Sequence, residues 1–209
     1  MGNILPKHVI QERSTTGAVE PSKHEECSVL FTDFSGFTQA TATMPAKRVV
    51  AELNEIFAGF DQICQEEGVE KIKTIGDAYM AVAGLFEGEK EHAQRCVKAA
   101  LKMQEFVAKR NEHATFKWGL RVGIPTGPAV SGVVGKHKFA YDIWGDAVNI
   151  ASRMESSGTV GRVNVSAYTY DLIRKNFECE YRGKVEAKGK GEVDMYFVKG
   201  ILSPSGNES

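Results

Sequence analysis

The order of two amphipathic segments and of the short apolar runs around them constrains the fold of this chain most strongly. Apolar residues recur at spacings of three, four and seven along residues 46–67 and along residues 89–113, as on one face of a helix. The run CSVLF, residues 27–31, comes before the first segment and has the continuous apolar character of a buried strand. KIKTIGDAYM, residues 71–80, lies between the two segments and predicts a β-hairpin with a Gly-Asp turn.

The second half of the chain continues with shorter elements. Alternating apolar residues predict a strand over 116–124, and a Gly-rich stretch follows at 125–135. Over the whole chain, the order of elements is β-α-β-β-α-β, followed by β-α-β-α-β-β. This order predicts an α+β fold of the ferredoxin-like kind: a mostly antiparallel sheet with helices packed on it. The later elements are a strand at 138–143, a helix at 147–156, a strand at 162–166, a helix at 168–176 and two strands around 187–198.

A single domain accounts for the length of the chain. With 209 residues and no repeat, we expect one domain over residues 26–200. Residues 1–25 are polar and weakly patterned, so we expect a linker there that includes at most a short helix. Residues 201–209 are expected to form a disordered tail.

Composition excludes several classes of partner. A net charge of −1, with lysine and arginine spread along the chain, gives no basic patch for nucleic acid or a membrane surface. No apolar run approaches the roughly 20 residues that span a bilayer. The four cysteines form no CxxC pair, so we expect reduced thiols in a cytoplasmic protein rather than a zinc site.

Two aspartates lie where strands are expected to end. Asp33 follows the first apolar strand and precedes a loop of small and polar residues, and Asp77 lies at the hairpin turn. If these strands are neighbours, the two carboxylates lie close together, and two carboxylates with substrate phosphates suffice to bind Mg²⁺. Each aspartate taken alone is more typical of an ordinary turn or helix cap, so the pair, rather than either residue, indicates phosphoryl or nucleotidyl transfer.

Two further motifs carry groups that suit an anionic ligand. Asn149 and Arg153 are four residues apart and therefore share one face of a predicted helix. Lys188 lies in a Lys-Gly-Lys-Gly stretch. Without context, an exposed polar helix face and a solvated turn explain these residues better than a binding site does.

The four motifs together resemble the catalytic domain of class III nucleotidyl cyclases. The matching stretches are VLFTDFSGFT, VEKIKTIGDAYMA, FAYDIWGDAVNIASRME and AKGKGEVDMYF, in the family's order and at its separations. The resemblance covers residues 26–200 and implies a palm-type α/β sandwich that works as a homodimer, with catalytic sites at the interface. It also implies an upstream sensor or regulatory domain, since ILPKHVI is similar to the linker that precedes this domain in larger cyclases.

The resemblance implies a role for each motif residue. Asp33 and Asp77, with the carbonyl of Phe34, would bind two Mg²⁺ or Mn²⁺ ions, and the loop Phe34, Ser35, Gly36, Phe37 and Thr38 would contact phosphate through its backbone. Asn149 would position the ribose, Arg153 would stabilise the pentavalent phosphorus and Lys188 would contact the terminal phosphates. Lys73 and Asp142 would recognise the base.

Lysine and aspartate at the base-reading positions favour ATP as the substrate. Lysine only donates hydrogen bonds and ionised aspartate only accepts them, which matches the ring nitrogen and exocyclic amine of adenine. Guanine presents the reverse pattern, and guanylyl members of the family carry glutamate where Lys73 stands. The predicted activity is an adenylyl cyclase that makes 3′,5′-cyclic AMP and pyrophosphate. The alternatives are a guanylyl cyclase and a non-catalytic regulatory or dimerisation domain of the same family.

Overall fold

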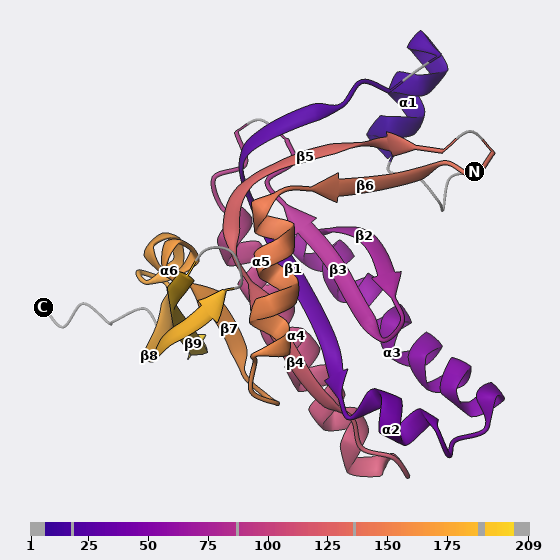
Figure 1. Cartoon of the computed structure of the whole chain (residues 1–209), viewed down its shortest axis with the longest axis vertical. Helices are drawn as coiled ribbons and strands as arrows, with labels where there is room; N and C mark the ends of the chain where they lie inside the picture. The colour runs from indigo at the N-terminus through magenta and orange to yellow at the C-terminus, as the bar shows by residue number, and fades with distance from the viewer. Residues whose placement is uncertain (1–6, 18, 87, 136, 188–190, 203–209) are drawn as a thin grey trace, which may run out of the picture.

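A single mixed sheet with helices on both faces forms the framework of the protein (Figure 1). The computed structural model describes residues 7–17, 19–86, 88–135, 137–187 and 191–202. The elements within this part of the chain are α1 (Lys7–Thr16), β1 (Ser22–Ser35), α2 (Phe37–Thr41), α3 (Ala46–Glu67), β2 (Glu70–Ile75), β3 (Ala78–Ala83), α4 (His92–His113), β4 (Gly119–Ile124), β5 (Thr126–Val134), β6 (Ala140–Trp144), α5 (Asp146–Ser156), β7 (Val163–Ser166), α6 (Ala167–Ile173), β8 (Phe177–Ala187) and β9 (Gly191–Ile201).

The strand order β2-β3-β1-β4-β7-β9-β8 confirms the predicted α+β class. The first six large elements follow the β-α-β-β-α-β order, and their strands lie in the ferredoxin-like arrangement with β1 and β3 in the middle. Every strand pair is antiparallel except β4 with β7. The sheet is therefore mostly antiparallel, as expected.

Strand β1 organises the sheet because it pairs with three strands along its length. Its first half pairs with β5, its middle pairs with β3 and its last residues pair with β4. Strand β5 in turn pairs with β6, so these two form an arm beyond the main sheet (Figure 1). The Gly-rich stretch at 125–135 therefore includes a strand of the arm, which the sequence pattern did not predict.

The two faces of β1 build two separate apolar cores. Leu30 and Phe34 contribute to the core beneath α3 and α4. Val29 and Phe31 contribute to the opposite core, which includes residues of α5 and Val9 of α1. Because successive side chains of a strand point to opposite faces, one strand supplies both layers.

The helix boundaries follow local signals in the sequence. Gly68 ends α3 with the left-handed φ of 67° that a helix C-terminus often requires. A proline is typical of the first helical position, but Pro45 is the N-cap of α3, so the helix begins one residue later, at Ala46. Strand β1 begins at Ser22, so the sheet starts inside the segment expected to be a linker. No described helix has the length and apolar character needed to cross a bilayer.

The contact between α5 and β4 requires a glycine. A Cβ on Gly123 would lie 2.6 Å from the backbone nitrogen of Glu155 and 2.9 Å from the carbonyl oxygen of Ala151. We expect Gly123→Ala to lower the free energy of unfolding by about 1–3 kcal/mol, because α5 has to move off the sheet. Gly127→Ala is the matched control, since its nearest neighbour, the Cβ of Ala147, is 3.7 Å away. Urea unfolding at one fixed protein concentration measures both, and equal losses would contradict this packing.

Candidate active site

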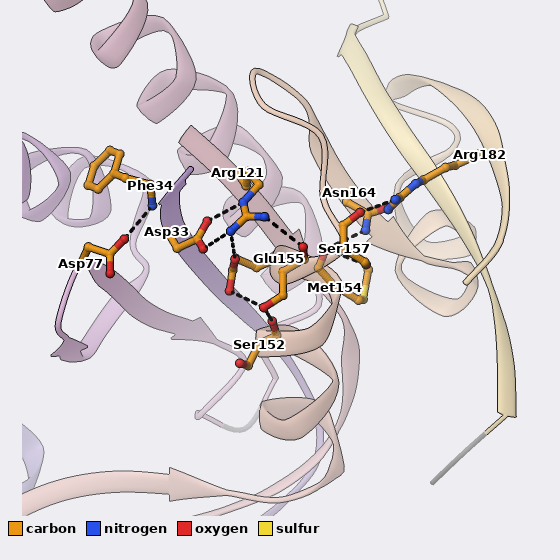
Figure 2. A network of polar contacts seen from close by, with 11 residues as sticks. Asp33, Phe34, Asp77, Arg121, Ser152, Met154, Glu155, Ser157, Asn164 and Arg182 are labelled. Carbon is orange, nitrogen blue, oxygen red and sulfur yellow. Dashed lines mark hydrogen bonds and ion pairs between the residues drawn. The ribbon is translucent and has the colours of Figure 1, made fainter. Parts of the chain in front are cut away.

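Asp33 is held by an arginine on the neighbouring strand. Asp33 on β1 lies directly opposite Arg121 on β4, so both side chains project from the same face of the sheet. Arg121 Nε donates to Asp33 Oδ1 at 2.8 Å, and Arg121 Nη2 donates to Asp33 Oδ2 (Figure 2). This two-pronged ion pair is the geometry in which arginine binds carboxylate most specifically. The ion pair raises the pKa of Arg121.

Asp77 reaches the same region from the β2–β3 turn. Its Oδ2 accepts a hydrogen bond of 3.1 Å from the backbone nitrogen of Phe34, the residue next to Asp33 (Figure 2). Burial raises the pKa of Asp77, the N–H of Phe34 opposes that shift, and the charge of Asp33 adds to it. The turn depends on Gly76, whose φ of 61° lies in the left-handed region. The structure thus brings together the two carboxylates predicted to bind metal.

The chemistry of this pair fits a hard divalent cation. Two carboxylates offer oxygen ligands, and Mg²⁺ completes its shell with water and substrate phosphate. Among the described residues, no group of three or more His, Cys, Asp or Glu side chains could hold a metal ion. Asp33 and Asp77 are therefore a two-carboxylate set, and a cation there has to share Asp33 with Arg121.

The loop after Asp33 leads into the short helix α2. Ser35 ends β1, Gly36 adopts a left-handed φ of 75° at the helix N-cap, and Phe37 and Thr38 form the first turn. No side chain caps this turn. The ring of Phe37 packs against Trp118 with centroids 5.4 Å apart, and Phe34 packs on the same ring at 5.5 Å, so the loop backbone is anchored from beneath.

Lys73 and Asp142 contact each other directly. Lys73 Nζ lies 2.5 Å from Asp142 Oδ2, which joins β2 to β6 of the arm. The register of β2 against β3 shifts between Lys71 and Lys73. In a regular strand these two lysines would share one face, yet Lys71 contacts Asp61 of α3 while Lys73 contacts β6. The bulge therefore turns Lys73 toward the other side of the sheet.

Lys73 also lines a pocket with the two predicted residues of α5. The pocket has a volume of about 280 Å³ and includes Asn149 and Arg153 with an apolar floor. Both side chains are exposed at its rim. Neither Asp33 nor Asp77 is among the described residues that line it. The floor and remaining wall consist of Phe31, Ile75, Met80, Val148 and Ser152.

A buried carboxyl group that no sequence motif indicated lies beside the ion pair. Glu155 of α5 is 3% exposed, and its Oε1 is 3.4 Å from Arg121 Nη2. Burial, followed by hydrogen bonding and charge repulsion with Asp33, raises the pKa of Glu155 to about 9. Arg121 also donates to the carbonyl oxygen of Ser156 at 3.0 Å, so its guanidinium joins β1 to the end of α5.

The sequence offered only weak signals for these two residues. Arg121 alternates with the apolar residues of its strand, which is equally typical of a solvated side chain, and Glu155 lies in a polar helix end.

Lys188 lies outside the described residues, so its predicted phosphate contact stays a prediction.

Comparison with known proteins identifies the family of the chain. The family model described as the adenylate and guanylate cyclase catalytic domain matches residues 19–200. The chain belongs to this family. An adenylate cyclase of Mycobacterium tuberculosis is 38% identical over 202 residues, covering 96% of this chain. The chain spans 45% of that relative's length, so it corresponds to a part of a longer protein there.

Solved structures of both substrate classes share the fold. The guanylate cyclase domain of a protein from Catenaria anguillulae, in complex with GTP, aligns with a TM-score of 0.80 at 34% identity, covering 87% of this chain and 100% of that one. The adenylyl cyclase CyaB from P. aeruginosa aligns with a TM-score of 0.79 at 28% identity, covering 89% and 98%. Family membership therefore establishes a cyclase catalytic domain, and the base that it prefers has to be argued from its own residues.

The raised pKa of Glu155 predicts that the difference in stability between Glu155→Gln and the parent protein depends on pH. Because the folded protein holds this proton above the ordinary carboxyl pKa, stability falls as pH rises from about 4.5 to about 9. Glu155→Gln cannot ionise, so the variant should gain at least about 1 kcal/mol relative to the parent between pH 5 and pH 9. Urea unfolding with a metal chelator present measures this, and a constant difference across that range would contradict it.

Proposed function

We propose that this cyclase domain is an adenylyl cyclase that converts ATP to 3′,5′-cyclic AMP and pyrophosphate at sites shared between two copies of the chain. The observation that carries the choice of base is the contact between Lys73 and Asp142 beside the pocket. The pair places a donor and an acceptor side by side, which is the complement of the adenine edge. Guanine would leave the lysine facing an N–H and the aspartate facing a carbonyl oxygen.

The division of the residues into two groups supports a shared site. Asp33 and Asp77 meet at the end of β1, whereas Lys73, Asn149 and Arg153 line a pocket that excludes both aspartates from its described lining. A two-fold dimer would face the carboxylates of one copy toward the pocket of the other, and symmetry would then produce two equivalent sites. Homodimerisation with such shared sites is part of the proposal.

Each group has a distinct task in the proposed reaction. Lys73 and Asp142 hold adenine, and Asn149 orients the ribose so that its 3′-hydroxyl lies in line with the α-phosphorus. Arg153 supplies positive charge where negative charge develops on the phosphate, and the uncapped first turn of α2 presents N–H groups to phosphate oxygens. Two Mg²⁺ or Mn²⁺ ions held by Asp33, Asp77 and the Phe34 carbonyl would activate the 3′-hydroxyl and neutralise the leaving pyrophosphate.

The setting of the domain is also part of the proposal. The four cysteines are free thiols, which supports a reducing, cytoplasmic location. The relative's greater length supports an upstream sensor or regulatory domain in the full protein. No charge pattern in the sequence supports a nucleic-acid partner.

Base choice is tested by a charge reversal at Lys73. With Mn²⁺ and either nucleotide, we expect the parent protein to prefer ATP over GTP by at least about tenfold in kcat/KM, since guanine leaves buried polar groups unpaired. Lys73→Glu should lower kcat/KM for ATP by at least about tenfold, while Lys98→Glu, on the exposed side of α4, should not. A parent that prefers GTP, or a Lys73→Glu protein that keeps full ATP turnover, would refute the assignment.

A further inference from the structure

Arg121 connects the two groups of active-site residues within one chain. On one side it binds both oxygens of Asp33. On the other side it donates to the carbonyl oxygen of Ser156 at 3.0 Å and lies 3.4 Å from Glu155 Oε1. All three guanidinium nitrogens are engaged, and the side chain is only 23% exposed, so its position is fixed by these partners.

The end of α5 depends on donors from three strands. Arg121 of β4 donates to the Ser156 carbonyl. Arg182 of β8 donates to the Ser157 carbonyl, and Asn164 of β7 donates to the Met154 carbonyl at 3.0 Å (Figure 2). The last carbonyls of a helix lack partners within the helix, and they attract positive charge, so these contacts hold its C-terminal turn in place. That turn carries Arg153.

A divalent cation at Asp33 would compete with the guanidinium of Arg121 for the negative charge of the same carboxylate. Each oxygen of Asp33 accepts one hydrogen bond from the guanidinium and keeps a second lone pair for a cation, but the cation and the guanidinium would then lie close together and repel each other. This repulsion weakens the ion pair that fixes Arg121 to β1, while the contacts of Arg121 to the end of α5 remain. The helix end is held less firmly as a result.

We propose that Arg121 couples the two catalytic sites of the dimer, because it links Asp33, which serves one site, to the helix end that carries Arg153 for the other. This inference rests on the shared-site arrangement proposed above. Cation binding at Asp33 loosens the last turn of α5. By thermodynamic reciprocity, loosening that turn strengthens cation binding at Asp33.

Hydrogen exchange tests the effect of cation binding on the last turn of α5, and Mn²⁺ binding tests the effect of that turn on cation affinity. The amides of Ser157 and Gly158 donate to the carbonyls of Arg153 and Glu155 at 2.9 and 2.7 Å, so their exchange reports on this turn. Saturating Mn²⁺ without nucleotide should accelerate their exchange about fivefold or more in the parent protein and leave it unchanged in Asp33→Ala. Mn²⁺ affinity is followed by the electron paramagnetic resonance signal of the free ion.

Two arginines that stack on the same ring provide a matched pair of variants. Arg182 and Arg162 lie 5.0 and 4.6 Å from the ring of Phe197, but only Arg182 contacts the end of α5, and Arg162 binds Glu180 instead. Arg182→Ala should lower the Kd for Mn²⁺ about fivefold, and Arg162→Ala should leave it within about twofold.

The outcomes distinguish this proposal from the proposed function. If the parent protein binds Mn²⁺ and turns over ATP, but Mn²⁺ leaves the exchange of residues 157 and 158 unchanged or slower, the coupling is refuted and the cyclase proposal stands. Equal Kd values for Arg182→Ala and Arg162→Ala would refute it in the same way. A parent protein that neither binds Mn²⁺ nor turns over nucleotide would overturn both.

Discussion

Strand β1 pairs with three strands along its fourteen residues, and the rest of the structure depends on this pairing. The antiparallel register with β4 sets Asp33 opposite Arg121, and the register with β3 brings the β2–β3 turn to the same end of the strand. Asp77 therefore meets the backbone of Phe34 without any local sequence signal that links them. The site is a consequence of strand pairing: Asp77 lies 43 positions from Phe34, and Arg121 lies 88 positions from Asp33.

The fold was predictable because its signals are local and periodic. The two long helices have continuous apolar faces, Gly68 ends α3 as its position indicates, and the hairpin turn lies at Gly76-Asp77. Strand β5 was not predicted, because its glycines resemble a loop and its buried positions do not alternate regularly. Its pairing partners, β1 and β6, supply the stability that its own sequence does not show.

The site was predictable only to the extent that its residues lie in motifs. The family resemblance indicated Asp33, Asp77 and Lys73 as candidates, but the bulge that separates Lys73 from Lys71 is a property of the pairing between β2 and β3. Arg121 and Glu155 were missed for a similar reason. A charged residue in an alternating strand or a helix end is ordinarily solvated, and only the packing of α5 on β4 shows that these two are enclosed.

The division of the candidate residues between the end of β1 and the α5 pocket leads to the central claim, that each site needs two chains. Mixing two variants with complementary defects tests it most directly: Asp33→Ala lacks one group and Arg153→Ala lacks the other. Each alone should have almost no ATP turnover, whereas an equal mixture that exchanges subunits should recover about one quarter of the parent activity, because half of the dimers then hold one intact site of two. If subunit exchange is shown independently and the mixture is still as inactive as its components, the shared site is contradicted.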